Sequence, residues 1–260
     1  MNNIIIKTAN SFGICDIGFC AFNTVKSRLL ECRAAMRIPQ NAASIILFLF
    51  PYKVREERPE KISRYAAVPD YHTVCGEYLK KIKTALEAEF PDNGFEPFID
   101  NSPIPEVYAA SCAGLGVIGE NGLLINERWG SWCFIGEIVT DLVLECANNP
   151  KKCSLCGVCK TACPRGIRSA DCLSALSQQK KPLSEDEKKA LYENNIIWGC
   201  DICAEVCPLN RSAELTYIEE FKNGYRDEYT PGEDIKNRAY AWRGEKVIRR
   251  NYEILNGENF

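Results

Sequence analysis

One stretch of the sequence decides the fold: Cys153-Ser154-Leu155-Cys156-Gly157-Val158-Cys159-Lys160-Thr161-Ala162-Cys163-Pro164. Its cysteine spacing is that of bacterial ferredoxins, in which three close cysteines bind one iron-sulfur cube and the fourth, before proline, binds a second cube. A second group, Cys200-x2-Cys203-x3-Cys207-Pro208, follows after a short interval. The sequence therefore predicts two 4Fe-4S clusters and a role in electron transfer.

The ligands of the two clusters follow from this spacing. Two cubes with four thiolates each need one cysteine more than the two motifs supply, and Cys172 lies between the motifs. We expect the first cluster to be bound by Cys153, Cys156, Cys159 and Cys207. We expect the second cluster to be bound by Cys163, Cys172, Cys200 and Cys203.

Cysteine pairs with this spacing also build structural zinc sites and disulfide frameworks. A zinc knuckle needs only paired ligands, whereas the third cysteine and the Cys-Pro ending are features of interleaved cubes. The start of the chain, Met1-Asn2-Asn3-Ile4, has no basic segment followed by an apolar one, so we expect no export to an oxidising compartment. The cytoplasm is the expected location.

The composition is that of a globular protein with a substantial core. The chain has 260 residues, 46% of them hydrophobic, and a net charge of -3. This charge lacks the basic field of a dedicated nucleic-acid binder, so any RNA contact must use a local patch. The longest apolar run, residues 42–50, is too short to span a bilayer and predicts a buried strand, so we expect no membrane anchor.

The region before the cysteine motifs alternates between helical and extended patterns. Apolar spacing predicts helices over residues 2–11 and 70–90 and strands over residues 16–22, 43–52 and 95–100. Ser102-Pro103 predicts the start of a further helix, which should end near residues 113–116. Residues 122–126 and 131–144 predict a hairpin with a four-residue connection.

We expect three domains. Residues 148–152 form a polar, turn-rich bridge, so the first domain is predicted to cover residues 1–147. The double-cluster domain is predicted to cover residues 148–215, and residues 216–260 form a C-terminal extension. Within the cluster domain, Ser184 and Glu187 form a capping box that starts a helix running towards Asn194.

Several motifs in this order resemble the epoxyqueuosine reductase family. They are Asp70-Tyr71-His72, Phe98-Ile99-Asp100, Ala113-Gly114-Leu115-Gly116-Val117-Ile118-Gly119-Glu120-Asn121, Gly130-Ser131-Trp132 with Gly136-Glu137, and Trp242-Arg243-Gly244 with Arg250-Asn251. With the cysteine motifs, the resemblance covers nearly the whole chain. It is similar to a short form of the family, without the C-terminal HEAT-like repeats of many members.

The resemblance implies an α/β (α+β) fold: a nitroreductase-like cobalamin-binding domain followed by a bacterial-ferredoxin-like double 4Fe-4S domain. It implies reduction of epoxyqueuosine to queuosine in the tRNA anticodon loop, with base-off cobalamin and two clusters as cofactors. It also implies an external low-potential electron donor, and we expect a monomer. The positions that match the family's corrinoid pocket are Ser63, Asp100, Leu124, Ile135, Ser174, Cys200 and Asp201.

Asp100 matches the family's proton donor. An aspartate two residues before Ser102-Pro103 could also cap the following helix. His72 is the single histidine, which excludes multi-histidine metal sites, and we interpret it as a partly exposed residue in the first turn of a helix rather than a cobalt ligand. Two other functions stay open: a same-fold corrinoid reductase of a small molecule, and a 4Fe-4S electron-transfer protein without tRNA activity.

Overall fold

A computed structural model of the chain describes residues 1–257, and its contacts divide it into two units. The first unit comprises Met1–Pro51 and Tyr71–Leu155, and the second comprises Tyr52–Asp70 and Cys156–Phe260. The chain therefore leaves the first unit after Pro51, returns at Tyr71, and leaves it again after Leu155.

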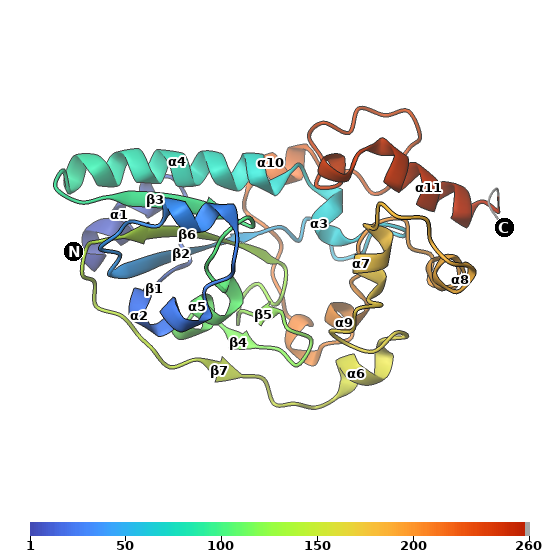
Figure 1. The fold of residues 1–260 in the computed structure, drawn as a ribbon, viewed down its shortest axis with the longest axis horizontal. Coiled ribbons are helices and arrows are strands. Elements are labelled where there is room, and N and C mark those ends of the chain that lie inside the picture. Colours follow the sequence, from blue (N-terminus) through green and yellow to red (C-terminus); the bar gives the residue numbers. More distant parts are fainter. Residues whose placement is uncertain (258–260) are drawn as a thin grey trace. The chain divides into compact units, whose positions relative to one another are not determined.

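The first unit contains a four-stranded antiparallel sheet in the order β1-β2-β6-β3 (Figure 1). The strands are β1 (Ile17–Ala21), β2 (Ser44–Pro51), β6 (Cys133–Thr140) and β3 (Phe95–Ile99). All residues of β2 are buried, which explains why this strand reads as one apolar run. The predicted strands over residues 16–22, 43–52 and 95–100 are confirmed.

Helices cover both faces of this sheet. The long helix α4 (Tyr71–Glu89) packs on β3 and β6, and α1 (Asn2–Ser11) packs on α4, which confirms both predicted helices. A Cβ atom at Gly136 in β6 would lie 3.0 Å from a Leu79 methyl group of α4. Side chains alternate along a strand, so the next residue, Glu137, points to the opposite face, where α5 (Glu106–Cys112) packs.

Short elements complete the first unit. They are α2 (Phe22–Val25), the 3₁₀ helices η1 (Lys26–Arg28) and η2 (Arg33–Arg37), and a small sheet of β5 (Leu124–Ile125), β4 (Val117–Ile118) and β7 (Lys151–Lys152). A Cβ atom at Gly116, just before β4, would lie 2.6 Å from the Ile125 carbonyl oxygen of β5. The glycine-rich motif therefore permits a close approach of two backbone segments.

Two predictions in this region are wrong. The hairpin of residues 122–126 and 131–144 does not form, because β5 pairs with β4 while β6 pairs with β2 and β3. A single bridge between Asn126 and Gly130 closes the connecting turn. The helix predicted from Ser102-Pro103 begins at Glu106 instead, because the Ser102 hydroxyl group accepts the Ile104 N–H at 3.0 Å in a turn before the helix.

The second unit is mainly helical. Its helices are α3 (Arg64–Ala67), α6 (Val158–Ala162), α7 (Leu173–Ser177), α8 (Glu185–Glu193), α9 (Ile202–Glu205), α10 (Glu219–Asn223), α11 (Glu245–Leu255), η3 (Pro208–Asn210) and η4 (Ala241–Arg243). Trp198 and Tyr240 are central in one apolar core, and Leu176 and Leu191 in another. The predicted capping box is confirmed, because Ser184 and Glu187 exchange both hydrogen bonds at the start of α8.

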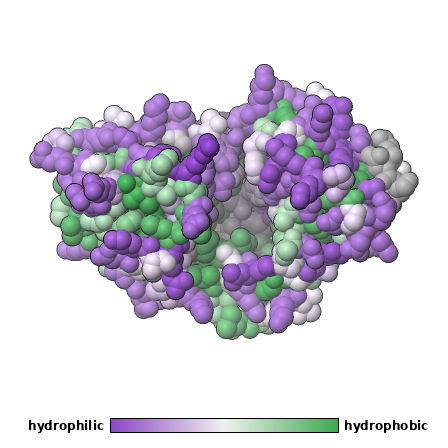
Figure 2. All heavy atoms as spheres, in the orientation of Figure 1, coloured by the Kyte–Doolittle hydropathy of each residue, from purple (hydrophilic) through white to green (hydrophobic). Residues whose placement is uncertain are grey.

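The surface is mostly polar, with scattered apolar side chains (Figure 2). The most exposed large apolar residues are Met36 (86%), Val143 (71%) and Met1 (60%). Of the cysteines outside the cluster motifs, Cys20, Cys75 and Cys112 are buried, whereas Cys15 is exposed. None of the helices among the described residues is long and apolar enough to cross a bilayer.

Candidate acid and cluster sites

Asp100 lies immediately after β3, at the start of the loop that leads to α5. Its backbone is in the left-handed region, with φ of 56°, which aspartate tolerates better than most residues. The N-cap residue of α5 is Pro105, so Asp100 is not at the capping position and the capping interpretation is wrong. Its side chain is 57% exposed, which leaves the carboxyl group accessible.

The partner of Asp100 is His72, in the first turn of α4. The distance from His72 Nε2 to Asp100 Oδ2 is 3.2 Å. The hydrogen bond with His72 is the largest influence on Asp100 and lowers the pKa of its carboxyl group, while burial opposes this shift. Tyr71 stacks between His72 and Phe134, with ring centroids 4.2 and 4.3 Å away. The pair therefore joins a strand end and a helix start into one acid-base unit.

A second carboxyl group, that of Glu137, lies in the interior on the α5 face of the sheet. Glu137 is fully buried in β6, and its Oε2 accepts a hydrogen bond from Ser102 Oγ at 2.5 Å. Burial raises the pKa of Glu137 well above its ordinary value of 4.5, and the charge of Glu106 raises it further. Burial without a cation therefore favours the neutral form of the Glu137 carboxyl group.

Glu106, the first residue of α5, interacts electrostatically with both Asp100 and Glu137. Burial raises the pKa of its carboxyl group to about 7, and the charge of Asp100 adds to this effect. The first unit thus holds three interacting carboxyl groups, Asp100, Glu106 and Glu137. The pKa of the Asp100 carboxyl group is lowered, whereas burial raises the pKa values of the Glu106 and Glu137 carboxyl groups.

The cysteine motifs surround two short helices of the second unit. Cys159 is in α6 and Cys203 is in α9, and these two helices pack against each other. Cys163 follows α6 and Cys207 follows α9, each directly before proline. Cys159 and Cys207 are predicted ligands of the first cluster, and Cys163 and Cys203 of the second. Each helix and the residue pair after it therefore contribute to both clusters, which agrees with interleaved ligand sets.

Three of the four thiols expected at the second cluster influence one another. Burial raises the pKa of the Cys200 thiol to about 12, and Cys203 and Cys172 contribute in the same direction. Such a thiol ionises only beside positive charge, which the iron ions of a cluster supply. Cys163, Cys172, Cys200 and Cys203 all belong to the second unit, as do Cys156, Cys159 and Cys207, whereas Cys153 belongs to the first.

The thiols do not converge as ligands of a single ion do. Within residues 1–257, no three His, Cys, Asp or Glu side chains are grouped closely enough to hold one metal ion. A structural zinc ion requires four ligand atoms within about 2.0–2.3 Å of one centre. In a cube each thiolate binds its own iron, and the cysteine spacing of the sequence is the feature that fits this group.

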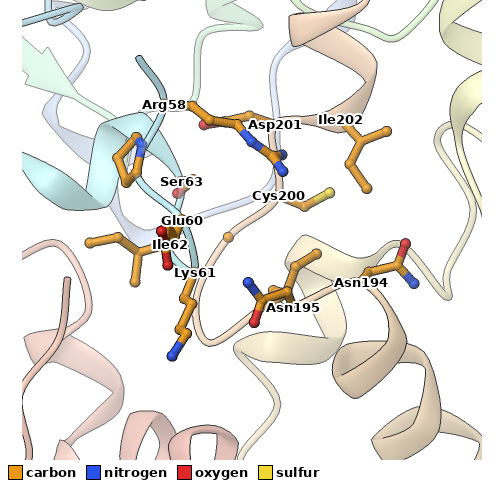
Figure 3. A pocket seen from close by; sticks show the side chains of 13 residues that line it. Arg58, Glu60, Lys61, Ile62, Ser63, Asn194, Asn195, Cys200, Asp201 and Ile202 are labelled. Atoms are coloured by element: carbon orange, nitrogen blue, oxygen red, sulfur yellow. The ribbon is translucent and has the colours of Figure 1, made fainter. Parts of the chain in front are cut away.

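A pocket in the second unit brings together three of the residues predicted to bind the corrinoid. Ser63, Cys200 and Asp201 line it, together with Arg58–Ile62 and Asn194–Ile196 (Figure 3). Asp201 Oδ2 accepts the backbone N–H of Arg64 at 2.6 Å, and burial raises the pKa of Asp201 to about 6. Ser63 Oγ is buried without a hydrogen-bond partner of good geometry among the described residues.

Ser174 lies close to this pocket through Tyr65. The side-chain amide of Gln178 reaches both Ser174 Oγ and Tyr65 Oη at 3.3 Å, and Trp198 Nε1 donates to Tyr65 Oη at 3.0 Å. A Cβ atom at Gly199, which has φ of 69°, would lie 2.0 Å from Ser63 Oγ, so glycine is required there. These contacts hold the pocket wall in place.

The other predicted pocket residues are in the first unit. Leu124 is buried in β5, and Ile135 is buried in β6. Ile99 pairs with Gly136, so Ile135 and Asp100 lie at the same end of the β3-β6 pair. Sequence reasoning missed the partnership of His72 with Asp100, and it also missed Glu106. The Gly136-Glu137 motif was noticed as a resemblance, but its burial followed only from the sheet.

Comparison with known proteins shows the family and a double 4Fe-4S cluster domain. Residues 34–101 match the family model described as epoxyqueuosine reductase QueG, DUF1730, and residues 152–210 match the 4Fe-4S double cluster binding domain. The epoxyqueuosine reductase of Listeria monocytogenes is 32% identical over 96% of this chain and 79% of its own length. The chain belongs to the epoxyqueuosine reductase family. The resemblance found in the sequence is thereby confirmed.

Other epoxyqueuosine reductases extend the comparison. That of Leadbetterella byssophila is 36% identical over 74% of this chain, and that of Escherichia coli is 32% identical over 82%. The chain spans 66% and 55% of the length of these two relatives, respectively.

Solved structures of epoxyqueuosine reductases share the fold. The enzyme from Streptococcus thermophilus superposes with a TM-score of 0.80 and 24% identity, covering 99% of this chain and 81% of that one. A family structure with an epoxyqueuosine-modified tRNA stem loop gives a TM-score of 0.83, with 23% identity and the same coverage. The predicted mixed α/β class with a double 4Fe-4S domain is confirmed.

Proposed function

We propose that this protein reduces epoxyqueuosine to queuosine in tRNA, using two 4Fe-4S clusters and a base-off cobalamin. The observation that carries the proposal is the His72–Asp100 pair at the end of β3, in a chain of this family that also has the double-cluster motif. The family structure with a modified tRNA stem loop supports the choice of substrate. An external low-potential donor would supply the electrons to a monomeric enzyme in the cytoplasm.

The domain roles follow from the sequence boundaries. Residues 1–147 would bind cobalamin and substrate, residues 148–215 would bind both clusters, and residues 216–260 would pack on the core; residues 258–260 lie outside the described part. The eight predicted cysteine ligands supply the donors that two cubes need. The electrons would therefore enter through the cysteine-rich segment.

The pocket of the second unit fits the polar periphery of a corrinoid. A corrin ring carries amide side chains, which need both donors and acceptors. Ser63 Oγ is a buried hydroxyl group without a hydrogen-bond partner of good geometry among the described residues, and Asp201 offers a carboxylate. The proposed corrinoid-binding residues of the second unit are Ser63, Ser174, Cys200 and Asp201, and those of the first unit are Asp100, Leu124 and Ile135. The bound corrinoid would supply a strongly reducing metal centre for the two-electron step.

The reaction requires protons as well as electrons. Converting an epoxide to an alkene consumes two electrons and two protons and releases the oxygen as water. Asp100 is the proposed proton donor to the departing oxygen. Because His72 lowers the pKa of Asp100, the resting carboxyl group is ionised at neutral pH and must gain a proton before it can donate one. His72, 3.2 Å away, would supply that proton before each transfer.

Anaerobic reconstitution tests the proposal. The protein would be loaded with iron, sulfide and cobalamin, reduced, and incubated with tRNA carrying epoxyqueuosine, and the nucleosides would be analysed by mass. Queuosine formation is the expected result. If both cofactors bind and no queuosine appears, a small-molecule substrate is favoured, whereas failure to bind a corrinoid favours an electron carrier.

Asp100→Asn tests the proton-donor role. We expect kcat to fall by about 100- to 10,000-fold, the usual contribution of general acid catalysis, with unchanged iron and corrinoid content. Asp92→Asn is the matched control, because Asp92 is an exposed aspartate just before the same strand. Full activity of Asp100→Asn would show that the proton comes from another group.

A further inference from the structure

An acid in the middle of a sheet needs an explanation. Glu137 is fully buried in β6, between Leu47 of β2 and Phe98 of β3. Glutamate is almost never fully buried unless it has a partner. Its partner here is a neutral hydroxyl group, that of Ser102, and its Oε1 is buried without a hydrogen-bond partner among the described residues.

Ser102 lies in the loop that carries Asp100. Its hydroxyl group donates to Glu137 Oε2 at 2.5 Å and accepts the Ile104 N–H at 3.0 Å. Its own N–H donates to the carbonyl oxygen of Asp100 at 2.6 Å. A chain of hydrogen bonds therefore runs from the centre of the sheet through Ser102 to the backbone of Asp100.

We propose that Glu137, acting through Ser102, is the residue that positions Asp100 for proton transfer. This inference rests on the proposed function, in which Asp100 donates the proton. Asp100 has a left-handed backbone and a largely exposed side chain, so its own packing restricts it little. The hydrogen bond from Ser102 Oγ to Glu137 Oε2 fixes Ser102, and Ser102 in turn holds the backbone of Asp100 through its N–H. A displacement of the reacting group by about 1 Å can lower the rate about 100-fold.

The protonation state of Glu137 agrees with this role. Burial favours the neutral carboxylic acid, and Glu106, the charged group that faces Glu137 from α5, favours it as well. A neutral acid can be replaced by the amide of glutamine, which has the same shape and keeps an oxygen to accept the Ser102 hydroxyl proton. Methionine has a similar size but no such acceptor.

Four variants separate positioning from stability: Glu137→Gln, Glu137→Met, Ser102→Ala and the double variant Ser102→Ala with Glu137→Met. The reconstituted holoenzyme would be assayed well below its Tm with tRNA carrying epoxyqueuosine, and kcat and KM would be determined. Iron and corrinoid content would be measured in each preparation. Amide hydrogen exchange of the peptide covering residues 99–105 would report on the loop without any turnover.

The expected results are specific. Glu137→Met lowers kcat about 10- to 100-fold with KM and cofactor content unchanged, and it speeds exchange in residues 99–105. Ser102→Ala has a similar effect, and the double variant is no slower than the slower single variant, because both act through one bond. Glu137→Gln restores kcat to within about threefold of the wild-type value.

Two outcomes would overturn the inference. One is a Glu137→Met enzyme with wild-type kcat and wild-type exchange; the other is additive losses in the double variant. If the wild-type protein makes no queuosine, the proposed function fails separately, and hydrogen exchange decides the inference: faster exchange in Glu137→Met supports the tie between the sheet and the Asp100 loop, and unchanged exchange refutes it.

Discussion

The two units bury their acidic side chains in opposite ways. In the first unit, Glu106 and Glu137 lie in the interior beside neutral or acidic groups, so burial raises both pKa values and favours the protonated forms. In the second unit, the guanidinium Nε of Arg64 donates to Glu205 at 2.6 Å, and the Arg64 backbone N–H donates to Asp201 at 2.6 Å. The pKa of Asp201 rises only to about 6, so this carboxyl group stays mainly ionised at neutral pH.

The difference shows how a buried partner decides what an acid can do. A carboxyl group beside a guanidinium group serves as a fixed charge that organises the chain around it. Arg64 uses this arrangement to bind the carbonyl oxygens of Arg55, Glu56 and Glu57 as well. A carboxyl group without a cation keeps its proton and can serve in proton transfer or as a neutral hydrogen-bonding group.

Removing the cation should have the largest effect on stability. Arg64→Met leaves Glu205 without its buried partner and removes the bonds to three carbonyl oxygens, so we expect the free energy of unfolding to fall by about 3–5 kcal/mol. Denaturant unfolding of the holoenzyme measures this. Arg64→Lys keeps the charge but lacks the forked geometry, so its free energy of unfolding should lie between those of Arg64→Met and the wild-type protein. A loss below about 1 kcal/mol for Arg64→Met would contradict the view that a buried cation stabilises the acidic side chains of the second unit.

Removing a titrating acid from the first unit should change the pH dependence of stability. The folded pKa of Glu106 is raised from 4.5 to about 7, so the folded state holds more protons than the unfolded state between these values. Its stabilising contribution is therefore present below pH 4.5 and is lost as pH rises towards 7. At 1.36 kcal/mol per pKa unit, this interval corresponds to at most about 3 kcal/mol.

Glu106→Gln lacks this titration. We expect the variant to gain stability relative to the wild-type protein as pH rises from 4.5 to 7, with a constant difference above pH 8. Unfolding curves at a series of pH values give the difference directly. Glu127→Gln, at an exposed turn of the same unit, is the control and should follow the wild-type curve. Parallel curves for Glu106→Gln and the wild-type protein would contradict a protonated Glu106.

Removing a surface ion pair should change stability least, and it gives a reference value for the effects of Arg64→Met and Glu106→Gln. Arg249 pairs with Glu245 one turn earlier in α11, and their side chains are 48% and 41% exposed. Arg249→Met should cost about 0.5 kcal/mol or less, because solvent and salt screen exposed pairs. The loss should shrink further in high salt. If Arg249→Met lost as much stability as Arg64→Met, burial would not be the cause of the difference between the exposed and the buried ion pair.

Much of the fold was readable from local patterns. The long helix α4 has apolar residues at helical spacing, and β2 is a continuous apolar run, so both were predicted with nearly the right ends. The start of α5 was misplaced because Ser102-Pro103 has the composition of a helix start, while its serine is engaged with Glu137, 35 residues away. A local pattern does not reveal a competing distant partner.

The linear sequence was enough to reveal the double-cluster domain and the family, because a cube constrains the spacing of cysteines within short segments. The eight cysteine ligands stay a prediction from that spacing. The tertiary structure alone decided the acid sites. His72 meets Asp100 across 28 positions, and Asp201 meets Arg64 across 137. Such contacts depend on which strands pair and which helices pack, and their energies arise from burial, which no local pattern records.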